Sequence, residues 1–112
     1  MKTSNDPRHI KRQHLVQELF KKEFHDQKID SAAINIINNL TSIDEIIKKA
    51  APEYPLDKIN KVDLAILRLA IYELTIDKSE PKNVIIDEAV ELAKEFGGEK
   101  SPGFINGALG NI

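Results

Sequence analysis

The chain has 112 residues, which is enough for one domain and too few for two. It has no cysteine, which excludes disulfides, cysteine-ligated zinc and thiol chemistry. The net charge is −2, but residues 1–28 hold seven Lys/Arg and four Asp/Glu, whereas the remainder holds nine and fourteen. This asymmetry indicates an anionic partner at the N-terminal end.

The N-terminal residues 1–12 are polar and show no apolar stretch of the kind found in a secretory signal. No apolar run approaches the roughly 20 residues of a membrane-spanning helix. We therefore expect a cytoplasmic protein that has no membrane partner.

Apolar spacing predicts helices almost throughout, because the alternation typical of strands is nearly absent. The first helix is predicted to begin at Asp6-Pro7, since Asp is a good N-cap and Pro fits the first helical position. Its apolar stripe extends to Phe24, and a second helix is predicted over residues 29–40. Ser42 and Glu45 have the spacing of a capping box, which predicts a short helix over residues 43–51.

The second half contains three further predicted helices. The segment 60–76 is apolar on most of its circumference, which indicates a helix in the middle of a bundle. A helix from Asn83 to Phe96 is predicted to end at Gly97-Gly98, because glycine suits the left-handed conformation that follows many helices. Ser101-Pro102 predicts the start of the last helix. We predict an all-α bundle of about six helices in a single domain, residues 1–112.

The sequence offers no catalytic constellation. It has no glycine-rich phosphate loop, no nucleophile–base pair and no His spacing that converges on a metal, so we expect no enzyme, no cofactor and no metal. The three histidines, His9, His14 and His25, are interpreted as exposed residues of the first helix. The acidic pairs Asp44-Glu45 and Asp87-Glu88 lie near predicted helix starts, where they complement the helix dipole.

Three cations form a candidate phosphate-binding patch. Arg8, Lys11 and Arg12 are spaced i, i+3 and i+4, so they project from one side of the first helical turns. The alternative interpretation is an ordinary solvated helix start. Phe104, next to the loop before the last helix, is a candidate for base stacking or for the core, whereas the spacing of Phe96 favours the core.

Two charged residues interrupt the apolar helix 60–76. If Asn60 caps that helix, Asp63 occupies the third position, where an acid is favoured. Arg68 lies well inside the helix and cannot remain unpaired if buried, so an internal salt bridge or hydrogen bonds to loop carbonyls are expected.

The second half of the chain contains three sequence motifs. The segment 62–74 reads VDLAILRLAIYEL, and Pro81 is followed over residues 84–94 by VIIDEAVELAK. The third motif combines FGGEKS at residues 96–101 with FINGAL at residues 104–109. In this order and spacing, the three motifs resemble those of the NusB family of transcription antitermination factors. The match before residue 43 is looser and follows the first helix.

The resemblance implies a binding protein that acts in transcription antitermination on ribosomal RNA operons. It implies boxA-type RNA, the small-subunit ribosomal protein NusE and the transcription elongation complex as partners. Transferred to this sequence, the RNA-binding positions are Arg8, Lys11, Arg12, Lys100, Ser101 and Phe104. The positions that contact the protein partner are Phe20 and Asp63.

Two departures from the family pattern are evident. The N-terminal half is shorter and implies the loss of about one helix, and Lys100 replaces an acid found in some members. Two other hypotheses remain open. One is a protein-only helical adaptor or homodimer, and the other is a stand-alone relative of the NusB-like domain fused to some RNA methyltransferases.

Overall fold

The computed structural model describes residues 6–24 and 27–112. This part of the chain contains six α-helices and no strand, which confirms the predicted all-α class. The elements are α1 (Pro7–Lys21), η1 (Ser31–Ala33), α2 (Ile34–Ile37), α3 (Leu40–Ala50), η2 (Leu56–Lys58), α4 (Lys61–Tyr72), the π-helical turn η3 (Glu73–Asp77), α5 (Lys82–Phe96) and α6 (Ser101–Gly110). None of these helices is both long and apolar enough to cross a membrane.

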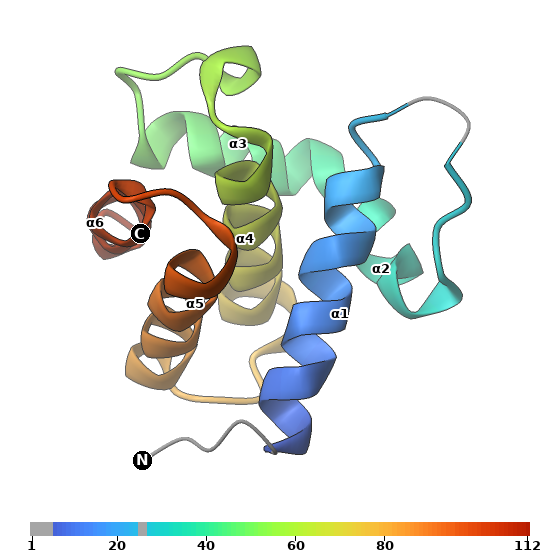
Figure 1. Cartoon of the computed structure of the whole chain (residues 1–112). Helices are drawn as coiled ribbons and strands as arrows, with labels where there is room; N and C mark the ends of the chain where they lie inside the picture. The colour runs from blue at the N-terminus through green and yellow to red at the C-terminus, as the bar shows by residue number, and fades with distance from the viewer. Residues whose placement is uncertain (1–5, 25–26) are drawn as a thin grey trace.

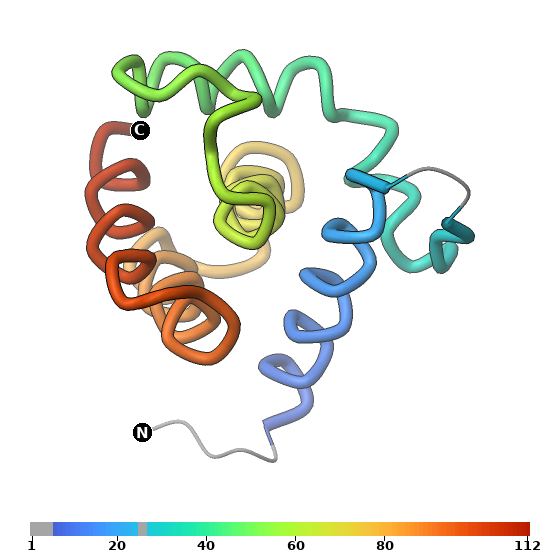
Figure 2. Tube along the Cα trace, turned by 45° about the horizontal axis from the view of Figure 1, so that its top comes forward, coloured from blue at the N-terminus to red at the C-terminus, as the bar shows by residue number. Residues whose placement is uncertain are grey.

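Helix α4 lies in the middle of the bundle. Figures 1 and 2 show α1, α3, α5 and α6 arranged around it, and it packs against all four. Every residue from Asp63 to Ile71 is buried. Removal of such apolar surface from water is the main force that stabilises a fold of this kind. The prediction that this segment is the centre of a bundle is confirmed.

The positive charge of Arg68, inside α4, is neutralised by two acidic side chains. The Arg68 side chain donates hydrogen bonds to both oxygens of Asp44, each 3.0 Å long, and to Glu23 at 2.7 Å. These contacts confirm the predicted internal salt bridge and connect α3 and the segment after α1 to the central helix. Asp44 therefore pairs with Arg68, a role that the helix-dipole interpretation had missed.

Two predicted N-caps are present, and the predicted capping box is not. The Asp6 carboxylate accepts a hydrogen bond from the Arg8 N–H (2.9 Å), and the Asn60 side chain accepts one from the Val62 N–H (2.8 Å). The capping box is wrong because α3 begins at Leu40, one turn earlier than expected. The Ser42 hydroxyl lies inside that helix and donates to the Asn39 carbonyl instead.

The N-terminal half differs from the prediction at its second helix. The helix predicted over residues 29–40 is replaced by η1 and the four-residue α2. The Asp30 side chain starts η1 by accepting from the Ala32 N–H at 2.8 Å. Phe24 lies beyond the end of α1 and is 45% exposed, so it is not part of the helical stripe.

Glycine ends α5 for a reason that differs from the expected one. Gly97 has an extended backbone (φ −92°, ψ −171°), so it does not need the left-handed region. A Cβ atom at Gly97 would lie 2.5 Å from the Ser101 Cβ and 2.8 Å from the Ala93 carbonyl oxygen. Glycine is therefore required for space where the start of α6 folds against the end of α5. The left-handed helix end occurs instead at Lys78 (φ 53°), directly after η3.

Candidate nucleic-acid interface

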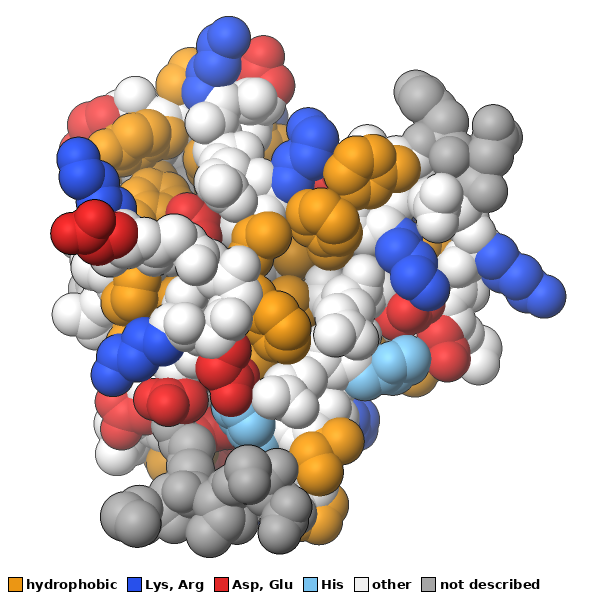
Figure 3. All heavy atoms as spheres, viewed as in Figure 1, with side chains coloured by type: hydrophobic (Ala, Val, Ile, Leu, Met, Phe, Trp, Pro, Cys, Tyr) orange, Lys and Arg blue, Asp and Glu red, His pale blue; other side chains and the backbone are white. Residues whose placement is uncertain are grey.

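The six predicted RNA-binding residues fall into two separate places. Arg8, Lys11 and Arg12 line a cavity of about 570 Å³ between α1, α2 and η3, here called the α1 cavity. Lys100, Ser101 and Phe104 line a cavity of about 320 Å³ at the start of α6, here called the loop cavity. In the described part of the chain the two cavities share no lining residue. Figure 3 shows acidic and basic side chains interspersed on one face of the molecule. This face therefore has no broad basic surface that would attract RNA by charge alone.

An aromatic pair forms one wall of the loop cavity. The Tyr54 and Phe104 rings meet edge to face, with centroids 5.1 Å apart and an interplanar angle of 77°. Tyr54 is 51% exposed, and Phe104 is half-buried against the core. Lys58 and Lys100 line the same cavity and are exposed. The site thus combines aromatic surface with two cations.

Sequence reasoning missed Tyr54. It lies between Pro52 and Pro55 in the connection from α3 to η2, a segment that bears no periodic pattern. An exposed aromatic residue in a proline-bounded loop was the available signal.

Ser101 shapes the loop and does not face outward. It is buried, and its hydroxyl oxygen accepts a hydrogen bond from the Gly98 N–H at 3.0 Å. In return, the Ser101 N–H donates to the Gly98 carbonyl at 3.1 Å. The structure corrects the expected placement: Ser101 fixes the turn that carries Lys100.

Asp63 is also buried, with 7% of its surface exposed. Its Oδ1 atom has no hydrogen-bond partner in the described part of the chain. Burial raises the pKa of the Asp63 carboxyl, while a hydrogen bond with Ser101 acts in the opposite direction. Because Asp63 is buried, it is not an accessible contact residue, as its assignment to the partner surface had implied.

Arg12 is the centre of a buried ion cluster. Its guanidinium binds Glu73 through two nitrogens, at 3.0 Å from Nε and 2.7 Å from Nη2, and it also pairs with Glu80 and Glu88. The Arg12 side chain is 8% exposed. Burial alone would lower the pKa of Arg12, but the hydrogen bonds to Glu73 and Glu80 raise it above its ordinary value. The structure therefore corrects the expectation that Arg12 projects freely beside Arg8 and Lys11.

His9 extends the cluster. It is buried, with Nδ1 3.2 Å from Glu88 and Nε2 2.8 Å from Glu95. The prediction of an exposed histidine is wrong for His9, and Glu88 belongs to this cluster, contrary to its helix-dipole interpretation. His14 is partly exposed and contacts Asp30 at 3.2 Å. His25 lies outside the described residues. Within residues 6–24 and 27–112, no group of His, Asp or Glu side chains is arranged to hold a metal ion.

Two cations of the N-terminal patch remain accessible. The Arg8 side chain is 70% exposed, although it pairs with Glu80 at 2.8 Å. Lys11 is exposed and makes no ion pair with any other described residue. These two residues, without Arg12, are the candidates for phosphate contacts at the start of α1.

A second aromatic pair lies at the other end of α1. The Phe20 and Phe24 ring centroids are 5.0 Å apart at an interplanar angle of 59°. Phe20 is half-buried against the core, whereas Phe24 is largely exposed. Figure 1 shows that the C-terminal end of α1 and the N-terminal end of α4 lie at the same end of the bundle. Phe20 and Asp63 therefore belong to one end of the molecule.

Phe96 was expected in the core, and its side chain is half-buried against the core.

Comparison with known proteins gives a consistent result. The model of the NusB family matches residues 2–112. The transcription antitermination protein NusB of Caldicellulosiruptor saccharolyticus is 42% identical over 91 residues, which cover 81% of this chain and 70% of that protein. The corresponding protein of Clostridium botulinum is 46% identical, with coverages of 81% and 68%. The solved structure of T. maritima NusB superposes with a TM-score of 0.81 at 35% identity, covering 98% of this chain and 90% of that one.

The burial of Asp63 predicts a specific pH dependence. The folded-state pKa is raised, so the folded protein holds this proton to a higher pH than the unfolded chain does. The contribution of Asp63 to the free energy of unfolding is therefore most favourable at low pH, and it declines as the pH rises from the unfolded value of 3.8 through the folded pKa.

Asp63→Asn removes this titration. Relative to the variant, the native protein should become more stable as the pH falls from 7 toward 4 in chemical denaturation experiments. A stability difference between the two proteins that is independent of pH would contradict the inferred shift.

Proposed function

This chain belongs to the NusB family, and on that premise we propose that it is an RNA-binding transcription antitermination factor. The proposed RNA is the boxA type of ribosomal RNA operons. The proposed protein partners are NusE and, through it, the transcription elongation complex. In this proposal the protein catalyses no reaction and acts by binding alone.

The observation that carries the RNA proposal is the composition of the loop cavity. Tyr54 and Phe104 offer aromatic surface on which unpaired bases can stack, which contributes about 1–3 kcal/mol per base in single-strand binding. Lys58 and Lys100 lie beside them, where they can neutralise the flanking phosphates. Sequence-specific RNA recognition usually targets unpaired bases of this kind. We assign a supporting role to Arg8 and Lys11, as phosphate contacts away from this cavity.

Two substitutions test the RNA proposal. Phe104→Ala should weaken binding of a boxA-type RNA about tenfold, because it removes a stacking surface. Lys100→Gln should weaken binding and should reduce the slope of log affinity against log salt by about 0.7, because one phosphate contact is lost. Both effects can be measured by fluorescence titration at several salt concentrations.

Two matched variants control for general effects. Phe24→Ala removes another exposed aromatic ring, and Lys28→Gln removes an exposed cation from the segment between α1 and η1, which does not line the loop cavity. Neither should change RNA affinity. Equal RNA affinities of the native protein, Phe104→Ala and Lys100→Gln would refute the site.

The Phe20–Phe24 pair is the proposed contact for NusE. Exposed aromatic residues that pack together are frequent anchors of protein interfaces. Because Asp63 is buried at the same end of the bundle, we propose that it acts on this interface by positioning the start of α4. In this proposal Phe20 and Phe24 contact NusE directly, and Asp63 supports the same interface without touching NusE.

NusE binding should therefore depend on the exposed ring. Phe24→Ala should weaken the complex about tenfold by calorimetry and leave the melting temperature nearly unchanged, because the side chain contributes little to the core. Phe20→Ala should weaken both the complex and the fold. Tyr54→Ala, which removes an equally exposed aromatic, serves as the control and should leave NusE affinity unchanged. If Phe24→Ala binds NusE as tightly as the native protein, the interface lies elsewhere.

A further inference from the structure

The α1 cavity has a buried apolar floor and polar walls. Leu15, Ile36 and Leu69 form the floor, and each is less than 7% exposed. At about 570 Å³, the cavity has the size of pockets that enclose small molecules in other proteins. A floor of buried side chains with this much open space above it is suited to a flat, partly apolar group.

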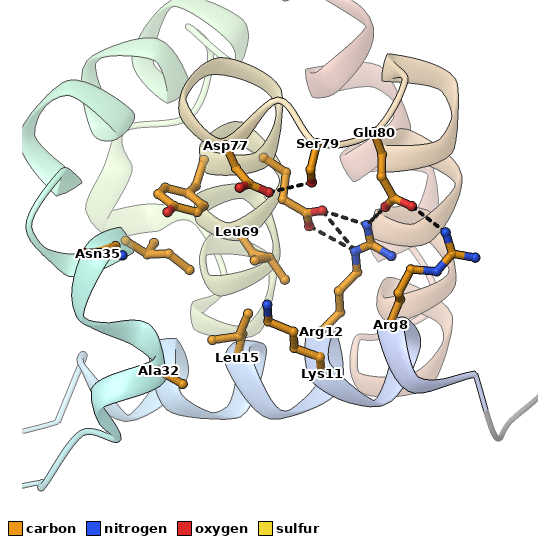
Figure 4. A pocket seen from close by; sticks show the side chains of 13 residues that line it. Arg8, Lys11, Arg12, Leu15, Ala32, Asn35, Leu69, Asp77, Ser79 and Glu80 are labelled. Carbon is orange, nitrogen blue, oxygen red and sulfur yellow. Dashed lines mark hydrogen bonds and ion pairs between the residues drawn. The ribbon is translucent and has the colours of Figure 1, made fainter.

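Most of the charge around this cavity is already neutralised within the protein. Glu73 is held by Arg12, and Glu80 is shared between Arg12 and Arg8 (Figure 4). These pairs leave little net charge at the side of the cavity nearest α5. A ligand would therefore be selected by the charged groups that have no ion-pair partner in the described part of the chain.

Two such groups face one another across the cavity. Lys11 extends from α1 toward Leu69 and makes no ion pair in the described part of the chain, whereas Asp77 lies on the opposite wall (Figure 4). The Asp77 Oδ2 atom accepts a hydrogen bond from the Ser79 hydroxyl at 2.7 Å, which holds the carboxylate in place and leaves Oδ1 to accept another. Tyr72, from the end of α4, supplies a half-buried aromatic ring to the lining.

We propose that the α1 cavity is a nucleotide pocket that prefers bases with an exocyclic amino group. In this arrangement Lys11 binds the phosphate, with Arg8 at the rim, and the base lies over the apolar floor beside Tyr72. Asp77 accepts a hydrogen bond from the amino group of adenine, cytosine or guanine. Uracil has no amino group, and its one donor, N3–H, lies between two carbonyl oxygens that would repel the Asp77 carboxylate.

The charge pattern favours a nucleotide over a protein side chain. A Lys or Arg side chain entering the cavity would approach Asp77 but would be repelled by Lys11. An acidic side chain would pair with Lys11 but is too small to fill the floor and presents no donor to Asp77. A nucleotide carries a phosphate at one end and an N–H donor at the other, which matches both walls.

The pocket extends the proposed RNA function but uses residues that do not line the loop cavity. It can therefore be tested with mononucleotides, without boxA-type RNA. The full chain would be titrated with AMP, CMP, GMP and UMP and followed by two-dimensional NMR. AMP, CMP and GMP should shift the backbone signals of Leu15, Asn35 and Tyr72, and UMP should bind about tenfold more weakly.

Three variants assign the contacts. Lys11→Gln should weaken CMP binding about tenfold, whereas Lys22→Gln, an equal charge change at the other end of α1, should have no effect. Asp77→Asn should remove the preference for CMP over UMP, because the amide offers both a donor and an acceptor.

The pocket is refuted by any of three results: no binding of the four nucleotides at millimolar concentration, equal affinity for CMP and UMP, or unchanged CMP affinity in Lys11→Gln. Loss of CMP binding in Phe104→Ala would place the nucleotide in the loop cavity and would also refute the proposal. If boxA-type RNA binding proves insensitive to Phe104→Ala while CMP still requires Lys11, the loop-cavity function fails and this pocket stands.

Discussion

The structure depends on the way in which Arg12 attaches α1 to the rest of the bundle. One guanidinium binds Glu73 from η3, Glu80 from the following loop and Glu88 from α5, and it does so inside the molecule. His9 adds a contact between α1 and two acids of α5. A buried cation of this kind is tolerated only when its partners are held in position. The π-helical turn η3 places Glu73 within hydrogen-bond distance of the Arg12 guanidinium. Lys78, in the left-handed conformation, then ends this turn and directs the chain toward α5.

Buried polar contacts at the two ends of α4 position the residues that line both cavities. With Arg12 fixed, Arg8 lies one turn further toward the N-terminus and Lys11 directly precedes Arg12, and both line the space that η3 and α2 enclose. At the other end of α4, the Asn60 cap and the buried Asp63 support the wall of the loop cavity, and Ser101 holds the turn that carries Lys100. Buried polar contacts thus determine where the exposed cations and aromatic rings lie.

The sequence predicted the class of fold because apolar spacing alone locates most of the helices. It also predicted the Asn60 and Asp6 caps and the pairing of Arg68, since each rests on a local rule. It did not predict the burial of Arg12 and His9, because their partners Glu73, Glu88 and Glu95 are more than 60 residues away along the chain. Tyr54 was missed for the same reason, since only the folded chain brings it to Phe104. Family resemblance pointed to Ser101 and Asp63 but carried no information about whether they are exposed.

The central claim is that Arg12 acts by holding α1 to η3, and a double-mutant cycle tests it most directly. Arg12→Ala, Glu73→Gln and the double variant would be unfolded with urea at pH 7. Arg12→Ala alone should cost about 3 kcal/mol, because it leaves buried carboxylates unpaired. The same change should cost much less when Glu73→Gln is already present, with a coupling free energy of about 2 kcal/mol. Effects that add to within about 0.5 kcal/mol would show that the pair does not hold α1 in place.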